Sequence, residues 1–327
     1  MIATRLHQGQ GLGNQLWCYA SCRSIANELK MPFMILGQEN FKAAKFLNID
    51  FSSKGVGASG TDYGFNLFHE QRFYDKEMDY IASCYDDRVE KLPIKTEIEG
   101  LFQSEKYFYG DLNKIQEYVR IKDEYRNLVN VAVGSCTLNI RGGEYKRHKR
   151  FILPKSYWLN AMSNMREMYG IHKFQIVTDD YKYARALFPE IEIIPEGVAE
   201  SYVALHNSSH LIVSNSTFSY FPIKTKATIP IVIAPKYFAR FNDHLNRWAS
   251  PANIYKDWLW QDRDGELQTY EECINEANHI EERYFSSYYI GVPLPPSGLK
   301  KISSMIPSII KRMLKKILST LFPLKYG

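Results

Sequence analysis

The chain has 327 residues, of which 45% are hydrophobic, 24% charged and 14% aromatic, with 19 glycines and 14 prolines. This composition is typical of a soluble globular protein and excludes a disordered chain, a collagen-like fibre and a small disulfide scaffold. The formal net charge of +5 comes from the C-terminal tail. Residues 299–327 hold seven basic residues and no acidic one, which leaves 34 basic and 36 acidic side chains elsewhere. A mildly acidic body gives no reason to expect nucleic-acid binding.

The cysteines and the N-terminal residues indicate the cellular compartment in which the protein is found. The five cysteines are odd in number and scattered along the chain, which favours a reduced compartment. No basic segment followed by an apolar one begins the chain, so we expect no signal peptide. No apolar run reaches the roughly 20 residues needed to span a bilayer. A cytoplasmic protein is therefore expected.

The predicted elements start with a short strand at 2–6, a glycine-rich turn and a helix over about 15–29. A glycine-rich loop at 54–64 and an aromatic, then helical, segment at 102–119 follow. From the strand-like run at 128–140 onward, strands alternate with helices. Strands are expected at 173–178, 191–194, 210–213 and 229–234, and helices at 154–169, 181–187 and 200–207. This alternation predicts a parallel, doubly wound sheet, which binds ligands outside the carboxyl ends of its strands.

Four groups of small polar or charged residues fall next to expected strand ends. The first contains Gly11, Gly13, Asn14 and Gln15 between a strand and a helix. Glycines there allow a close approach to a phosphate or a neighbouring domain, and they equally suit a tight turn that packs the helix. Their spacing differs from the dinucleotide-binding fingerprint.

The second group is Asn139, Arg141 and Glu144, at the end of a buried strand. An arginine there can bind a diphosphate through paired hydrogen bonds, or it can form a surface salt bridge with Glu144. The third group is Asp179 and Asp180, which close the next strand. A carboxylate at this place can accept two hydrogen bonds from guanine, or it can cap the following helix.

The fourth group follows a later strand and is Asn215, Ser216, Thr217, Phe218 and Ser219. Hydroxyls and backbone N–H groups that open a helix can bind phosphate oxygens, although ordinary helix capping is an equally common use. Four such groups at strand ends together indicate an anionic ligand. The histidines show no metal-ligand spacing, so we expect no bound metal.

Four blocks resemble, in this order, the signature blocks of glycosyltransferase family 11, the bacterial and animal α-1,2-fucosyltransferases of the larger fucosyltransferase superfamily. They are GLGNQLWCYA (11–20), LNIRGGEY (138–145), VTDD (177–180) and IVSNSTFSYF (212–221). The resemblance covers about residues 2–260. It implies an α/β, GT-B-like fold of two Rossmann-like domains with a cleft between them. It also implies inverting transfer of fucose from GDP-fucose without a metal or other cofactor.

The resemblance carries roles to individual residues. Arg141 matches the arginine that holds the donor diphosphate, and Asp179 or Asp180 matches the acid that recognises guanine. The residues at 215–219 match the donor-site serine block, and those at 11–15 match a loop facing the cleft. Arg141 and Glu144 are the expected catalytic residues. Glu144 is the candidate base, and a donor phosphate oxygen is the alternative proton acceptor.

Three positions depart from the family pattern. Asn139 stands in place of a histidine, Gly142 in place of a second arginine, and Glu144 in place of an aspartate. Two alternatives therefore stay open besides a fucosyltransferase. One is a transferase that uses a different GDP-sugar, and the other is a non-catalytic, nucleotide-binding scaffold of polysaccharide assembly.

The expected organisation has five parts. They are an N-terminal α/β domain on the acceptor side (1–127), a nucleotide-sugar-binding α/β domain (128–265), a helical return segment (266–292), a proline-rich linker (293–298) and a basic amphipathic helix (299–327). In that helix, apolar pairs recur every four residues between basic residues, which predicts binding to an anionic membrane surface rather than to the enzyme body. The expected partners are a GDP-sugar donor, a glycan acceptor and the inner face of the plasma membrane. The acceptor is either a free glycan or one linked to a lipid.

Overall fold

The computed structural model describes residues 1–286 apart from 55–63, 76–79, 243–245 and 249. The described residues form one compact unit. The expected linker at 293–298 and the expected basic helix at 299–327 lie outside the described residues. Among those that are described, no helix combines the length and the apolar character needed to cross a membrane.

A four-stranded parallel sheet organises the N-terminal half, in the order β2-β1-β7-β4. Its strands are β1 (Ile2–Arg5), β2 (Phe33–Leu36), β4 (Asn66–His69) and β7 (Thr96–Glu99). Two small antiparallel pairs accompany it: β3 (Leu47–Asn48) with β8 (Arg120–Ile121), and β5 (Arg72–Asp75) with β6 (Tyr80–Ser83). The helices of this half are α1 (Leu12–Glu28) and α2 (Asn113–Tyr118).

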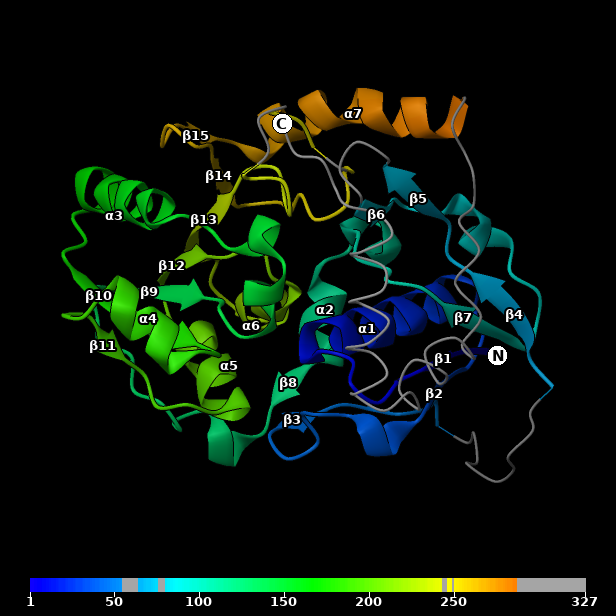
Figure 1. The fold of residues 1–327 in the computed structure, drawn as a ribbon. Coiled ribbons are helices and arrows are strands. Elements are labelled where there is room, and N and C mark those ends of the chain that lie inside the picture. Colours follow the sequence, from blue (N-terminus) through cyan, green and yellow to red (C-terminus); the bar gives the residue numbers. More distant parts are fainter. Residues whose placement is uncertain (55–63, 76–79, 243–245, 249, 287–327) are drawn as a thin grey trace, which may run out of the picture. The chain divides into compact units, whose positions relative to one another are not determined.

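Helix α1 connects β1 to β2 and lies at the centre of the described structure (Figure 1). It is buried on nearly all its faces, because apolar and small residues surround its axis instead of forming one stripe. Trp17 on this helix packs against Tyr220 and Phe221 of the C-terminal half, with ring centroids 4.3 and 5.4 Å apart. One hydrophobic core therefore includes residues of both halves.

A seven-stranded sheet organises the C-terminal half, in the order β11-β10-β9-β12-β13-β14-β15. Its strands are β9 (Ser135–Ile140), β10 (Lys173–Thr178), β11 (Glu192–Ile193), β12 (His210–Val213), β13 (Ile231–Pro235), β14 (Leu259–Gln261) and β15 (Leu267–Gln268). All neighbours pair in parallel except β14 and β15. The helices are α3 (Lys155–Tyr169), α4 (Tyr181–Leu187), α5 (Val198–Asn207), α6 (Tyr220–Lys224) and α7 (Tyr270–Ser286).

The chain runs from β9 outward to β10 and β11, and then returns to β12 on the other side of β9. This is a doubly wound sheet whose direction of winding reverses between β9 and β12, where such sheets hold their ligands. The expected α/β class is confirmed, with one parallel and one largely parallel sheet. The domain boundary near residue 127 stays a prediction.

One strand and one helix begin at other residues than predicted. The strand-like run at 128–140 becomes a strand only at Ser135, because a turn precedes it. There, Gly134 adopts a left-handed φ of 73° and the Ser135 N–H donates to Ala132 O. The helix expected to begin at 200 begins at Val198.

Candidate active site

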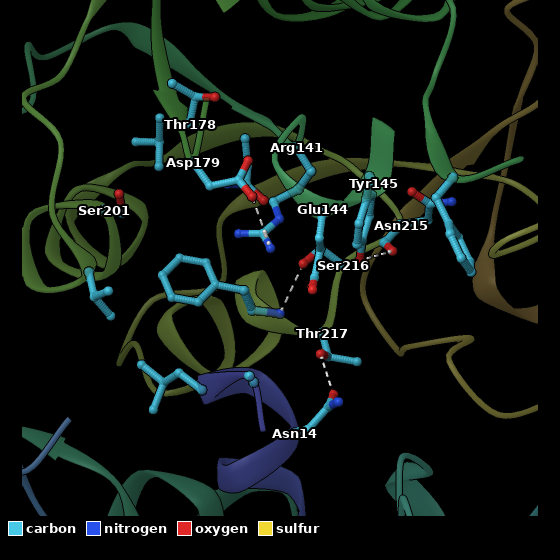
Figure 2. A pocket seen from close by; sticks show the side chains of 18 of the residues that line it. Asn14, Arg141, Glu144, Tyr145, Thr178, Asp179, Ser201, Asn215, Ser216 and Thr217 are labelled. Carbon is cyan, nitrogen blue, oxygen red and sulfur yellow. Dashed lines mark hydrogen bonds and ion pairs between the residues drawn. The ribbon is translucent and has the colours of Figure 1, made fainter. Parts of the chain in front are cut away.

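A cavity of about 630 Å³ lies where the carboxyl ends of the two sheets face each other. The C-terminal half contributes the segments after β9, β10, β11 and β12, and the other half contributes the loop before α1 and residues near β7. Several of its lining side chains point toward one another across the space (Figure 2). The volume is in the range of small-molecule sites in proteins.

Arg141 follows β9, and its guanidinium is held by two neighbours. Its Nη2 lies 3.1 Å from Asp179 Oδ2, and its central carbon lies 5.4 Å from the centre of the Tyr145 ring. The side chains of Arg141 and Asp179 are 21% and 26% exposed, so both are mostly shielded. Arg141 Nε has no hydrogen-bond partner among the described residues. The guanidinium is therefore oriented and keeps donors for an anionic ligand.

Asp179 also fixes the loop that follows Arg141. Its Oδ1 accepts a hydrogen bond of 2.9 Å from the Gly142 N–H. A Cβ atom at Gly143 would lie only 2.5 Å from Asp179 Oδ2, so this carboxylate approaches because Gly143 has no side chain. A Cβ atom at Gly142 would lie 2.7 Å from Asp180 Cβ. Glycosyltransferase family 11 has a second arginine at the position of Gly142. In this chain the neighbouring Asp180 leaves no room for such a side chain.

Asp180 has a different environment from its neighbour and does not line the cavity. It accepts a hydrogen bond of 3.1 Å from the Tyr183 N–H as the N-cap of α4, and it forms an ion pair with Lys146. Partial burial opposes ionisation, but the Lys146 and Tyr183 hydrogen bonds outweigh it and lower the pKa of Asp180. Of the two acids considered for guanine recognition, only Asp179 faces the cavity.

Two buried amide side chains lie at the ends of neighbouring strands β9 and β12. Asn139 and Asn215 are each 1% exposed, and both line the cavity. Asn139 Oδ1 and both polar atoms of the Asn215 side chain have no hydrogen-bond partner among the described residues. An unsatisfied buried polar group costs about 1–3 kcal/mol. Such atoms at the rim of a cavity indicate a place for a polar ligand or water.

The segment after β12 forms the short 3-10 helix η7 (Thr217–Ser219). Ser216 caps it, since Ser216 Oγ accepts a hydrogen bond of 3.3 Å from the Phe218 N–H. Ser216, Thr217 and Phe218 line the cavity, whereas Ser219 does not. The Ser219 hydroxyl is buried and donates to Ser216 O at 3.0 Å. Capping and cavity lining thus occur in the same segment.

The glycine-rich loop of the first half brings the two halves together. Gly11, Gly13 and Asn14 line the cavity, and a Cβ atom at Gly13 would lie 2.5 Å from the carbonyl carbon of Thr217. Asn14 Oδ1 accepts hydrogen bonds from Thr217 Oγ1 at 2.8 Å and from Gln103 Nε2 at 3.0 Å. Gly13 is therefore required for contact between α1 and η7.

Gln15, the other residue predicted in this loop, lies outside the cavity. It is buried, and it donates to Asn40 O at 2.7 Å and accepts from the Lys42 N–H at 3.1 Å.

Several lining residues have no counterpart in the sequence-based prediction. They are Lys42, Leu101, Gln103, Glu196, Gly197, Val198 and Ser201, together with the aromatic residues Phe151 and Phe238. Glu196 could have been found, because it follows β11 as the four polar groups follow their strands. Leu101, Gln103 and Phe238 lie in two further segments that resemble family 11 weakly, LFQSEKYF (101–108) and IAPKYF (233–238). Lys42 and Phe151 come from segments without a local signal. Within the part of the chain that the structure describes, no group of three or more His, Cys, Asp or Glu residues could hold a metal ion.

Comparison with known proteins adds information about the fold. No family model matches the chain, and neither does any curated protein. Among solved structures, the fucosyltransferase NodZ from Bradyrhizobium is similar at a TM-score of 0.43 and 14% identity, covering 71% of this chain and 94% of that chain. POFUT1 in its apo form is similar at a TM-score of 0.45 and 10% identity, covering 71% and 97%. The likenesses are distant and concern the α/β architecture alone.

Proposed function

We propose that the protein is an inverting glycosyltransferase, most specifically an α-1,2-fucosyltransferase resembling family 11. It would transfer fucose from GDP-fucose to a galactose-like hydroxyl of a bacterial surface polysaccharide or oligosaccharide. One observation carries the proposal. The Arg141 guanidinium is oriented by Asp179 at the rim of a cavity that also receives unpartnered polar atoms of Asn139 and Asn215. The Arg141 guanidinium and the Asn215 side-chain N–H group are hydrogen-bond donors that suit a departing diphosphate.

The chemistry follows from the charge that develops in the reaction. In transfer from a GDP-sugar, the anomeric carbon becomes positively charged while the bond to the diphosphate breaks. Donors already fixed at the leaving oxygens stabilise that charge without rearranging. Arg141 and the side-chain amide of Asn215 supply such donors. Glu144, which is exposed and lines the cavity, is the candidate base for the acceptor hydroxyl, and a phosphate oxygen is the alternative.

The sequence blocks give independent support. Residues from the four blocks that resemble family 11 line one cavity, although as many as 207 positions separate them, as between Gly11 and Phe218. Their convergence is what a shared donor site would require.

The acceptor glycan would bind on the side of the first sheet. A second cavity of about 410 Å³ lies at the carboxyl ends of β1 and β7, and it shares Asn14 and Leu101 with the first. Its lining includes His7, Gln10 and Glu99, which can hydrogen-bond to sugar hydroxyls. An extended acceptor could thus occupy this cavity while its reactive hydroxyl reaches the first.

A panel of nucleotide sugars tests the proposal directly. The purified protein should release GDP from GDP-fucose, and do so faster when a galactose-terminated oligosaccharide is present, with a fucosylated product in mass spectrometry. Turnover of another GDP-sugar in preference to GDP-fucose would support the alternative donor, which the Asn139 departure favours. Calorimetric GDP binding without turnover on any acceptor would support the scaffold alternative, which the Gly142 departure favours.

The tail at residues 299–327 supports a peripheral membrane location. Its alternation of apolar pairs and basic residues suits the surface of an anionic leaflet. The full chain should cosediment with anionic vesicles, and a chain ending at Pro296 should not. Equal sedimentation of the two chains would contradict this part of the proposal.

A further inference from the structure

The cavity extends beyond Arg141 toward the edge strand β11. The strand order β11-β10-β9-β12 arranges the lining residues in sequence, with Glu196 after β11, Asp179 after β10, Arg141 after β9 and Asn215 after β12. Figure 2 shows Ser201 of α5 and Asn215 on opposite sides, with Arg141 between them. A diphosphate held at Arg141 therefore leaves space toward β11 and α5.

That end of the cavity suits a flat aromatic ring. Val198 is exposed there, and Phe218 lines the same cavity with its ring edge-on to Tyr202, at a centroid distance of 6.3 Å. The ring of Phe218 is only partly buried, and a partly exposed aromatic ring in a cavity can stack with a nucleobase. Toward β12, by contrast, the lining is polar: Asn215 is buried, and the Tyr145 hydroxyl donates to its carbonyl at 3.3 Å.

Three carboxylates line the cavity, and they differ in what they contact. Both oxygens of Asp179 are engaged, one by the Gly142 N–H and the other by Arg141. Glu144 belongs to the loop directly after Arg141, beside the expected diphosphate. Glu196 makes no hydrogen bond or ion pair with any described residue, and it lies next to Val198 at the far end. It is thus the carboxylate free to contact a base at that end.

We infer that Glu196 is the residue that selects guanine, a role that rests on the proposed function. Guanine presents adjacent N1–H and N2–H donors on one edge, and the two oxygens of a carboxylate can accept both. Hypoxanthine lacks the N2 amino group, and adenine presents an acceptor at N1. Asp179 then acts as a positioning residue that orients Arg141 and the Gly142 N–H.

Nucleotide affinities test this assignment. Calorimetry with GDP, IDP and ADP is carried out on the wild-type protein, on Glu196→Gln and on the control Glu190→Gln, an exposed glutamate outside the cavity. The wild type should bind GDP about 10- to 100-fold more tightly than IDP. Glu196→Gln should bring the two affinities close together, and Glu190→Gln should keep the wild-type ratio. Because Glu196 is exposed, its variant is expected to fold normally.

A second variant separates the two acids. Asp179→Asn should weaken GDP and IDP binding by the same factor, because it disturbs the diphosphate side and not the base. The assignment is overturned if Glu196→Gln keeps the wild-type preference for GDP over IDP, or if Asp179→Asn removes it. If the wild-type protein binds no nucleoside diphosphate at all, the proposed function fails together with the inference.

Discussion

Asp179 in the second sheet and Glu70 in the first are both carboxylates placed at strand ends that accept backbone hydrogen bonds, yet their environments differ. Asp179 is 26% exposed and faces the Arg141 guanidinium. Glu70 is 3% exposed, and it accepts hydrogen bonds from the Leu101 and Phe102 N–H groups and from the Tyr107 hydroxyl. Burial raises the pKa of Glu70 to about 7, although these hydrogen bonds oppose the shift.

The difference shows how surroundings assign roles to the same chemical group. A carboxylate beside a cation at a cavity rim can orient that cation toward a ligand. A carboxyl group that is removed from water and enclosed by backbone donors holds a loop and becomes sensitive to pH. The loop that Glu70 holds leads to Gln103, which binds Asn14 at the edge of the cavity. Glu70 therefore serves the site through structure, and Asp179 serves it through charge.

The largest effect is expected from removing the cation that Asp179 orients. Arg141→Ala should lower turnover of the GDP-sugar by about 10²–10³, because one fixed donor to the leaving group is lost. Steady-state kinetics measure the loss. Arg147→Ala, an exposed arginine outside the cavity, is the matched control and should keep near wild-type turnover. An Arg141→Ala rate within a few-fold of wild type would refute the diphosphate role.

The next largest effect is the pH dependence of the free energy of unfolding, which we expect from the buried Glu70. Because its folded pKa of about 7 is above the reference value of 4.5, the folded state binds the proton more tightly than the unfolded state does. The stabilising contribution is complete below about pH 4.5 and is lost as pH rises through 7, by roughly 3 kcal/mol in total. Denaturant unfolding at pH 5 and pH 8.5 measures it. Glu70→Gln should flatten this dependence, and an unchanged pH profile in that variant would rule out Glu70 as its source.

Removing the charge of Asp179 should act on function rather than on folding. Asp179→Asn leaves an oxygen for the Gly142 N–H but weakens the pairing with Arg141. A loss of about 1.5–3 kcal/mol is expected in transition-state stabilisation, equivalent to about tenfold or more in kcat/KM. The free energy of unfolding should change much less than in Glu70→Ala. A stability loss as large as that of Glu70→Ala would remove the contrast between the two acids.

The smallest effect tests the contact that joins the two sheets. Gly13→Ala adds a methyl group 2.5 Å from the Thr217 carbonyl carbon, so α1 and η7 must move apart. Overpacking of this kind costs about 1–3 kcal/mol of unfolding free energy, and the shift should also weaken GDP binding. Gly11→Ala, where an added methyl meets no atom within 4 Å, should cost less. Equal stability of the two variants would contradict the tight contact.

Local sequence pattern predicted the second sheet well and the first sheet poorly. Strands β9, β10 and β12 are apolar runs that alternate with helices, so their ends and the polar groups after them could be located. In the first half only β1 was predicted, because a glycine-rich turn and a helix follow it directly. The other strands of that half are two to four residues long, and β4 (NLFH) is mostly exposed. Such short segments carry little periodic signal.

The sequence alone determined that Arg141, Asp179 and Ser216 share one edge of a sheet, since the carboxyl ends of parallel strands coincide there. It could not determine that Asp179 faces the cavity while Asp180 caps a helix, because both lie at the same strand end. Nor could it show the burial of Glu70 or the contact of Gly13 with Thr217. Those depend on which distant segments pack together and exclude water, and only the tertiary structure decides that.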